Sequence, residues 1–190
     1  MGHSRASKQA THERIVSIAA ERFCELGIDG LSIANLMKEA GLTHGGFYKH
    51  FESRDQLVAE ALDAALQRSD DPQRASKASF AIFVSAYLSH AHRDAIGTGC
   101  ALGALVNDIG RVEGEARELY THRLNASFAF LAKQLCVTEG TGRAEAIVAF
   151  SAMVGALGLS RAVADEALSR EILDTMLAYL LNNFAPGTES

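Results

Sequence analysis

The 190-residue chain has two prolines, three cysteines and no tryptophan, and these shortages exclude several classes of structure. Pro72 and Pro186 stand outside the long stretches rich in Ala, Leu and Glu, which favours uninterrupted helices. No run alternates apolar and polar residues over a length that indicates a strand. Cys24, Cys100 and Cys136 are widely spaced and contain no CxxC pair, so they form neither a disulfide framework nor a zinc pattern. The composition predicts an all-α protein in a reducing, cytoplasmic setting.

Long apolar runs and a secretion signal are also lacking. The most apolar run covers residues 146–159, which is shorter than the roughly 20 residues that a membrane-spanning helix needs. The start of the chain shows no charged segment followed by an apolar one. The sequence therefore predicts no membrane insertion.

Charge is distributed unevenly, although the asymmetry is small. The formal net charge is −5, and residues 1–54 hold 7 of the 18 Lys and Arg, 6 of the 23 Asp and Glu, and four of the seven His residues. The first part is thus near +1 and the remainder near −6. Charge alone does not indicate nucleic-acid binding, but it is compatible with a compact module whose few cations face one way.

Motifs for catalysis or metal binding are incomplete. His12 and Glu13 begin an HExxH pattern, but Val16 occupies the position of the second histidine. The chain has no Gly-Lys-Ser or Gly-Lys-Thr sequence, so it has no P-loop. Glu118 and His122 are four residues apart on an expected helix, where a surface pair is the simplest interpretation. We expect no enzymatic activity, no cofactor and no metal.

Residues 31–57 carry the most informative pattern. Apolar residues lie at helical spacing on one face of the first segment, at Ile33, Leu36, Met37 and Ala40. Ser32 is placed to cap this helix, and Gly41 lies where a C-cap favours positive φ. Leu42 fills the corner, and Thr43 caps a second short helix. The segment predicts two helices joined by a glycine turn.

The second of these helices combines aromatic and basic residues. Phe47 and Phe51 are four apart and can anchor the helix to the core. Tyr48, Lys49 and His50 then face outward as donors for phosphate oxygens or base edges. This arrangement is typical of a helix-turn-helix that places one helix end in a DNA groove.

The segment and the helix before it match a known pattern at Ile15, Ala19, Phe23, Gly27, Ala40, Gly41, Leu42, Thr43, Gly45, Phe47, Tyr48, His50, Phe51, Ser53, Arg54 and Leu57. In these positions the chain resembles the DNA-binding domain of the TetR family of bacterial transcriptional regulators. The resemblance is specific over about the first third of the chain and only architectural beyond Leu66. Pattern and resemblance together predict DNA contacts from Ser32, Thr43, His44, Gly45, Tyr48, Lys49, His50 and Arg54.

Two positions depart from the family pattern. Met37 stands where the family usually has Ala, which suggests different helix packing, and Gly46 stands where it usually has Ser or Thr. Gly45 and Gly46 are therefore adjacent, and each costs about 1 kcal/mol relative to Ala inside a helix. Either the missing side chains let backbone amides approach DNA closely, or glycine is simply tolerated at a frayed helix start.

The rest of the chain predicts a second, helical domain. Together with the helix-turn-helix, further helices expected at residues 9–26, 53–69, 76–92, 100–109, 113–135, 143–164 and 165–184 give about nine in all. We expect a DNA-binding domain at residues 1–52 and a ligand-binding and dimerisation domain at 53–190, with 53–69 as the linking helix. Residues 1–9 are expected as a mobile tail, whose Arg5 and Lys8 either follow a phosphate strand or are simply solvated.

The last two helices carry more apolar surface than one exposed hairpin requires. Small and large apolar residues alternate on them, which favours close helix packing. Pairing with the same hairpin of a second chain would give a four-helix bundle and a homodimer, as the family resemblance also implies. Packing wholly inside one subunit is the alternative. The predicted interface residues are Ala152, Gly155, Ala156, Leu173, Met176, Leu177 and Leu180.

The second domain also offers a candidate lining for a small, partly apolar or aromatic effector. Its expected members are Phe83, Tyr87, His90, Asn107, Arg111, Tyr120, Phe128 and Met153. The aromatic members of this set can equally be ordinary core.

These features predict a homodimeric repressor that a small molecule releases from a pseudo-palindromic, double-stranded DNA operator. The family resemblance supplies the repressor role and the induction by a ligand. Two alternatives remain. Cys100 follows a glycine loop at an expected helix start, where the helix dipole favours a reactive thiolate, so the chain could sense oxidants or electrophiles. It could also be a helical ligand-binding protein with a degenerate DNA-binding head.

Overall fold

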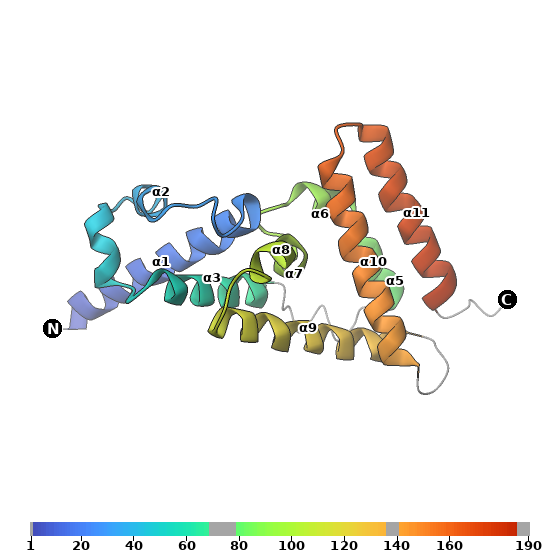
Figure 1. The fold of residues 1–190 in the computed structure, drawn as a ribbon, viewed down its shortest axis with the longest axis horizontal. Helices are drawn as coiled ribbons and strands as arrows, with labels where there is room; N and C mark the ends of the chain where they lie inside the picture. Colours follow the sequence, from blue (N-terminus) through green and yellow to red (C-terminus); the bar gives the residue numbers. More distant parts are fainter. Residues whose placement is uncertain (1, 69–78, 136–140, 186–190) are drawn as a thin grey trace. The chain divides into compact units, whose positions relative to one another are not determined.

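The computed structural model describes residues 2–68, 79–135 and 141–185, and over these ranges it is helical with no strand. The all-α prediction is confirmed. The described residues form ten α-helices and one 3₁₀-helix (Figure 1). In chain order these are α1 (Gly2–Leu26), α2 (Ile33–Glu39), η1 (His44–Lys49), α3 (Arg54–Arg68), α5 (Phe80–Tyr87), α6 (His90–Asp94), α7 (Ala101–Ala104), α8 (Val106–Ile109), α9 (Glu115–Gln134), α10 (Gly142–Ala162) and α11 (Glu166–Phe184).

The chain divides into two compact units. The first comprises residues 1–70 and 96–121, and the second comprises residues 71–95 and 122–190. The division falls inside α9, so this single helix contributes to both units. The functional boundary that we expect after residue 52 remains a prediction, because compactness alone does not define which residues bind DNA.

The first unit is built around the packing of α1 on α3. Ile15, Ala19 and Phe23 recur at four-residue spacing on α1, and all three are at most 2% exposed. Leu57, Ala61 and Leu62 of α3 are also buried. This spacing gives each helix one apolar stripe, and burying both stripes holds the helices together.

Helix boundaries differ from the expected ones at three places. The helix α1 begins at Gly2, where the sequence predicted a mobile tail up to residue 9. The single helix expected over residues 76–92 is interrupted, because Ser89 caps a new helix by accepting a hydrogen bond from the backbone N of His92 at 3.1 Å. The helix expected over residues 100–109 is likewise two short helices, which meet at Leu105.

The second unit is built on the antiparallel pair α10 and α11. Buried apolar residues of this pair include Ala149, Phe150, Met153, Ala156, Leu157, Leu173, Leu180 and Phe184. Three of the predicted dimer residues, Ala156, Leu173 and Leu180, are therefore packed inside the subunit at no more than 3% exposure. Their burial favours packing within one subunit, and their role in a dimer interface remains a prediction.

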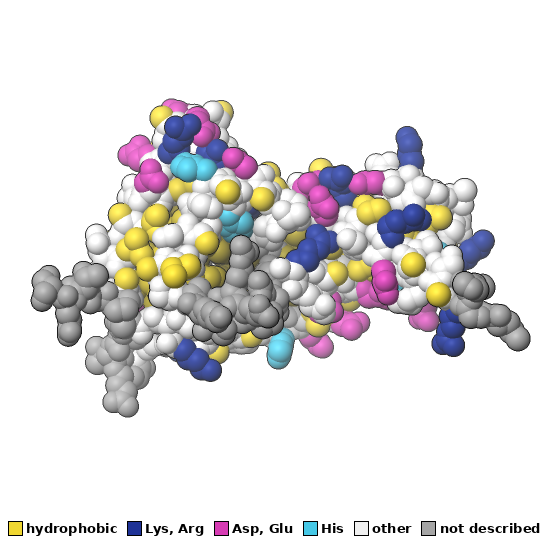
Figure 2. All heavy atoms as spheres, turned by 180° about the vertical axis from the view of Figure 1, so that it is seen from behind, with side chains coloured by type: hydrophobic (Ala, Val, Ile, Leu, Met, Phe, Trp, Pro, Cys, Tyr) yellow, Lys and Arg dark blue, Asp and Glu magenta, His cyan; other side chains and the backbone are white. Residues whose placement is uncertain are grey.

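The outer surface of the second unit retains apolar side chains. Figure 2 shows hydrophobic side chains gathered over the part that holds α5, α10 and α11, with charged groups of both signs scattered elsewhere.

The helix α10 is long and apolar enough to cross a membrane by length and composition alone, a property that it shares with core helices of soluble proteins.

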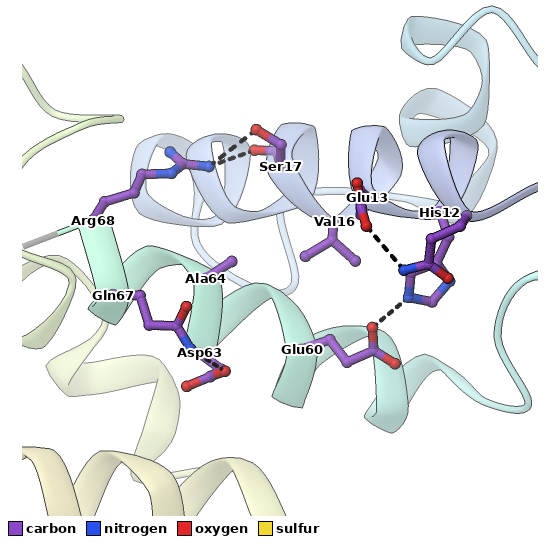
Figure 3. A pocket seen from close by; sticks show the side chains of 10 residues that line it. His12, Glu13, Val16, Ser17, Glu60, Asp63, Ala64, Gln67 and Arg68 are labelled. Carbon is purple, nitrogen blue, oxygen red and sulfur yellow. Dashed lines mark hydrogen bonds and ion pairs between the residues drawn. The ribbon is translucent and has the colours of Figure 1, made fainter. Parts of the chain in front are cut away.

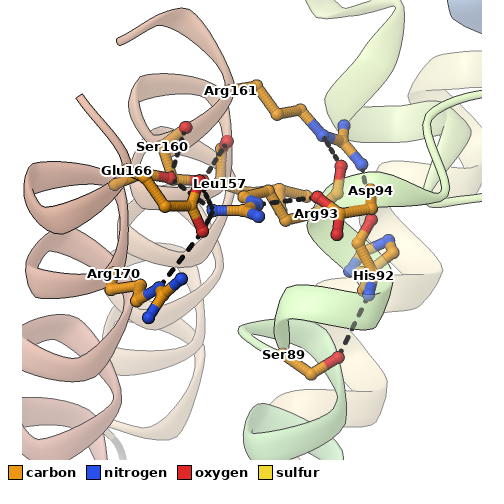
Figure 4. Close-up of polar contacts among 10 residues, drawn as sticks. Ser89, His92, Arg93, Asp94, Leu157, Ser160, Arg161, Glu166 and Arg170 are labelled. Atoms are coloured by element: carbon orange, nitrogen blue, oxygen red, sulfur yellow. Dashed lines mark hydrogen bonds and ion pairs between the residues drawn. The ribbon is translucent and has the colours of Figure 1, made fainter. Parts of the chain in front are cut away.

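A polar cluster joins α6 to the start of α11 and the end of α10 (Figure 4). Arg161 donates to the carbonyl oxygens of His92 and Arg93 at 2.8 and 2.9 Å, which satisfies acceptors at the end of α6. Arg93 donates to Ser169 Oγ at 2.9 Å and to the Glu166 carboxylate at 3.1 Å. These bonds fix the short helix α6 against the long pair.

Candidate nucleic-acid interface

The turn between α2 and η1 has the caps that the sequence indicates. Ser32 Oγ accepts a hydrogen bond from the backbone N of Asn35 at 3.2 Å and so caps α2. Gly41 has φ +70°, a conformation that favours glycine, and the backbone N of Leu42 donates to Met37 O at 2.8 Å. These two local interactions set the direction in which the chain enters η1.

The predicted second short helix of the pair is a 3₁₀-helix, η1. Thr43 precedes it in an extended conformation without a side-chain cap bond. Phe47 is fully buried and Phe51 is 2% exposed, and their rings stack with centroids 5.2 Å apart. The two phenylalanines therefore anchor η1 to the core as predicted.

The outward residues form an exposed set of donors. Tyr48 is 70% exposed, with its ring edge-on to Phe47 at 5.2 Å between centroids. Thr43, His44, Gly45 and Lys49 are also exposed. This face presents hydroxyl, imidazole, ammonium and backbone amide groups to solvent. Groups of these kinds bind phosphates and base edges.

Arg54 is engaged within the protein. Its guanidinium donates to Leu31 O at 3.1 Å and to Ile28 O at 2.5 Å, and it lies 3.9 Å from Asp29. These bonds tie the first turn of α3 to the loop that leads into α2. A contact between Arg54 and the DNA backbone remains a prediction. The hydrogen bonds in the structure hold the helix-turn-helix in position.

His12 of α1 contacts both Phe51, which follows η1, and Glu60 of α3. His12 Nε2 lies 2.5 Å from Glu60 Oε2, and its ring stacks on Phe51 with centroids 4.5 Å apart. Glu60 also accepts from Gln56 Nε2 at 2.8 Å. Figure 3 shows His12 and Glu60 facing each other across the hollow between α1 and α3. The sequence analysis missed this contact, because it joins residues 48 positions apart and no local motif marks it.

His50 is the C-cap residue of η1 and lies next to the exposed donors. It is half-buried, and its ring centroid lies 6.4 Å from that of His12. Burial lowers the pKa of His50, and the electrostatic effects of His12, Lys8 and Lys49 lower it further. At neutral pH the ring is therefore held in its neutral form until a negative partner compensates these charges.

The predicted effector residues are divided between the two units. Phe83, Tyr87, Phe128 and Met153 belong to the second unit, where Tyr87 and Phe128 both approach Phe150 with centroids 6.3 and 5.8 Å apart. Met153 is fully buried, and His90 is exposed on α6. The sequence analysis did not include Phe130 and Phe150, which complete this aromatic cluster.

The other three predicted effector residues lie in the first unit. Tyr120 is buried and donates from its hydroxyl to Leu102 O at 2.7 Å. Burial raises the pKa of Tyr120 to about 12, with a smaller contribution from Cys100. Asn107 and Arg111 are exposed, and Arg111 lies 3.6 Å from Asp108. The hydroxyl of Tyr120 is thus bonded within this unit, and its contact with an effector remains a prediction.

Cys100 precedes α7, a helix of only four residues. The thiol is half-buried, and such a short helix provides little dipole to favour the thiolate. A reactive thiolate at Cys100 thus gains little support from a helix dipole, and the sensing of oxidants remains a prediction. Within the described parts of the chain, no group of three or more His, Cys, Asp or Glu side chains could hold a metal ion.

The fold and this surface define a helix-turn-helix head followed by a helical unit. Residues 15–61 match the family model described as "Bacterial regulatory proteins, tetR family". Curated relatives include the HTH-type transcriptional regulator TtgR of Pseudomonas putida, which is 32% identical over 69 residues, or 36% of this chain and 33% of TtgR. Residues 15–61 thus resemble the DNA-binding domain of the tetR family, and the chain spans about a third of the length of the curated relatives that it matches.

Solved structures extend the likeness to the whole fold. A TetR transcriptional regulator from Chloroflexus aurantiacus J-10-FL superposes with a TM-score of 0.77 at 22% identity, over 94% of this chain and 98% of that chain. AibR, determined in complex with isovaleryl coenzyme A and operator DNA, superposes with a TM-score of 0.65 at 14% identity, over 93% of this chain and 99% of that chain. At these identities the likeness establishes the fold.

Proposed function

We propose that this protein is a sequence-specific DNA-binding transcriptional regulator of the cytoplasm, a homodimeric repressor released from its operator by a small molecule. The observation that carries the proposal is the exposed donor face of Tyr48, Lys49 and His44, which two buried phenylalanines hold in place. The family match covers this same segment. The curated relatives that share it are transcriptional regulators, which favours regulation over catalysis.

The operator would be read by two heads. In a symmetric dimer, each η1 enters one major groove, and the two half-sites lie about one helical turn apart. Thr43, Lys49 and backbone amides at Gly45 would hold phosphates, whereas Tyr48 and His44 would reach base edges. Arg54 and Ser32 would act by fixing the turn that presents these groups.

The dimer would form through the outer surface of α10 and α11. Val148, Leu159 and Tyr179 are 53, 60 and 56% exposed, an unusual degree for apolar side chains on the two longest helices of the second unit. A Cβ added at Gly155 or Gly158 would meet nothing within 4 Å, so the backbone of α10 is open to close approach. Of the predicted interface residues, Gly155 is exposed and Ala152, Met176 and Leu177 are half-buried, which keeps them as candidates.

The effector would bind at the aromatic cluster of the second unit. Phe83, Phe128 and Phe130 are half-buried there, and Arg143 lies over the Phe128 ring at 5.8 Å from its centroid. Such a cluster suits a small molecule that is partly apolar or aromatic. AibR was determined with isovaleryl coenzyme A, which shows that a protein of this fold holds an acyl ligand. The dimer would release the operator if the ligand binds more tightly to a conformation in which the distance between the two heads does not match the two half-sites.

Binding to duplexes selected from a random DNA pool tests the proposal. Selection should enrich a pseudo-palindromic sequence, and fluorescence anisotropy should show affinity that falls by roughly a thousandfold or more between about 50 and 200 mM salt. The double variant Tyr48→Ala/Lys49→Ala should lose this binding with an unchanged helical circular dichroism spectrum. Absence of any enriched sequence, with a folded dimer in solution, would reject the function.

A further inference from the structure

A second hollow of the DNA-binding head lies between α1 and η1. Its volume is about 690 Å³, and it is lined by Ser7, Lys8, Thr11, Leu42, Tyr48, Lys49 and His50. Among the described residues that line it, none is acidic. The hollow therefore joins the start of α1, which lies outside the helix-turn-helix, to the exposed donors of η1.

The cations of this hollow lack the compensation that Arg22 and Arg54 have. Arg22 is held by the carboxylate of Glu39 at 2.8 Å, and Arg54 is held by backbone carbonyls. Lys8 and Lys49 form no ion pair among the described residues. Lys8 and Lys49 also both lower the pKa of His50 through their positive charges. The two positive charges are therefore concentrated around the hollow. Such a concentration favours an anion.

His50 adds a hydrogen-bonding group with a defined direction, and Thr11 completes the lining on α1. His50 Nδ1 is buried and has no hydrogen-bond partner among the described residues, so Nε2 is the ring nitrogen that an outside partner can reach. Thr11 lies three residues after Lys8, on the same face of α1. Its hydroxyl donates to Ser7 O at 2.9 Å, so Thr11 lines the hollow without a free donor, and the donors for an anion come from Lys8, Lys49 and His50.

We propose that this hollow receives a phosphate of the operator backbone, so that α1 holds the DNA together with η1. The inference rests on the proposed function and assigns Lys8 as a further DNA-binding residue. DNA is the fitting source of the phosphate, because Tyr48 and Lys49 belong both to the hollow and to the groove-facing surface. A contact from α1 would fix the angle at which η1 enters the groove, since two separated phosphate anchors prevent rotation about either one.

The test measures the salt dependence of DNA binding for variants of Lys8. Fluorescence anisotropy would use two labelled probes, a duplex selected from a random pool and a duplex of random sequence. For Lys8→Gln, the plot of log affinity against log salt should become shallower by about 0.9, and the affinity for both probes should fall by the same factor. Lys8→Arg should restore the slope. Lys133→Gln removes an equal charge from an exposed site on α9 and should leave the slope unchanged.

The outcomes separate this inference from the proposed function. A shallower slope for Lys8→Gln alone supports the phosphate site. An unchanged slope in a protein that still binds the selected duplex overturns the phosphate site and leaves the regulator intact. Equal changes for Lys8→Gln and Lys133→Gln also overturn the phosphate site, because they would reflect net charge only. Failure of the wild-type protein to bind either probe at any salt concentration overturns both.

Discussion

At the residue scale, the two departures from the family pattern are in contact with each other. A Cβ built on Gly46 would lie 3.5 Å from Met37 Cε and 3.8 Å from Thr43 Oγ1. Met37 is fully buried, and its Cε would be in van der Waals contact with that Cβ, so atoms beyond the Cβ would compete with Met37 for space. The larger residue on α2 and the smaller one on η1 therefore compensate each other in volume.

This pairing predicts that the two positions are energetically coupled. Gly46→Ser should lower the free energy of unfolding more in the wild-type background than in the Met37→Ala background, where the serine hydroxyl has space. The coupling free energy should be about 0.5 kcal/mol or more. Urea unfolding of the four proteins of the cycle measures it. Gly45→Ser is the matched control, because a Cβ at Gly45 meets nothing within 4 Å and its effect should add to that of Met37→Ala. Additivity at both positions would contradict the pairing.

His92 makes stability depend on pH. Its Nδ1 lies 2.6 Å from Tyr87 O, and its pKa is lowered by burial first and by Arg161 as well, against an opposing effect of that backbone bond. A histidine with a lowered pKa in the folded state contributes stability that is complete above its unfolded value, near 6.5, and that declines as the pH falls below it. The free energy of unfolding should therefore fall as the pH drops below about 6.5, and His92→Gln should flatten this profile. His50 acts in the same direction, so parallel profiles for variant and wild type would exclude a role for His92.

At the element scale, local signals were readable from the sequence and tertiary ones were not. Ser32 and Gly41 predicted the caps of α2 correctly, because a cap depends on the residue and its immediate neighbours. The break at Ser89 went unpredicted, since the aromatic stripe of residues 80–88 runs up to it and no Gly or Pro marks the end of a helix there. The His12–Glu60 contact depends on the packing of α1 on α3, and no pattern within either helix indicates it.

Arg54 shows how one side chain joins several elements, and it carries a prediction of its own. Its two bonds to Ile28 O and Leu31 O need the planar fork of a guanidinium. Arg54→Lys keeps the charge and should still destabilise the protein by about 1–3 kcal/mol, because at least one half-buried carbonyl loses its donor. Arg54→Gln should destabilise it by a similar amount. Urea unfolding together with DNA anisotropy distinguishes the roles: full stability in Arg54→Lys with weakened DNA binding would identify Arg54 as a phosphate contact instead.

At the scale of the whole molecule, the apolar pattern of α10 and α11 predicted a helix pair but not which residues face outward. Both sides of α10 are apolar, so periodicity could not separate Ala156, which is buried, from Leu159, which is 60% exposed. Val148, Gly155 and Leu159 follow each other at intervals of seven and four residues and lie on one face of α10. We therefore expect a second copy of the chain to cover this face.

That expectation leads to a test of assembly. Leu159→Glu and Tyr179→Glu each place a charge where the partner would pack, and each should raise the dimer dissociation constant by roughly 30-fold, as for a residue that contributes about 2 kcal/mol. Sedimentation equilibrium measures the change, and anisotropy should show a parallel loss of affinity for a two-half-site duplex. Leu26→Glu, at a residue that is 55% exposed on α1, is the matched control and should leave the dimer unchanged. A dimer that survives both α10 and α11 variants would place the interface elsewhere, and the spacing of the two heads would then have to be set by another surface.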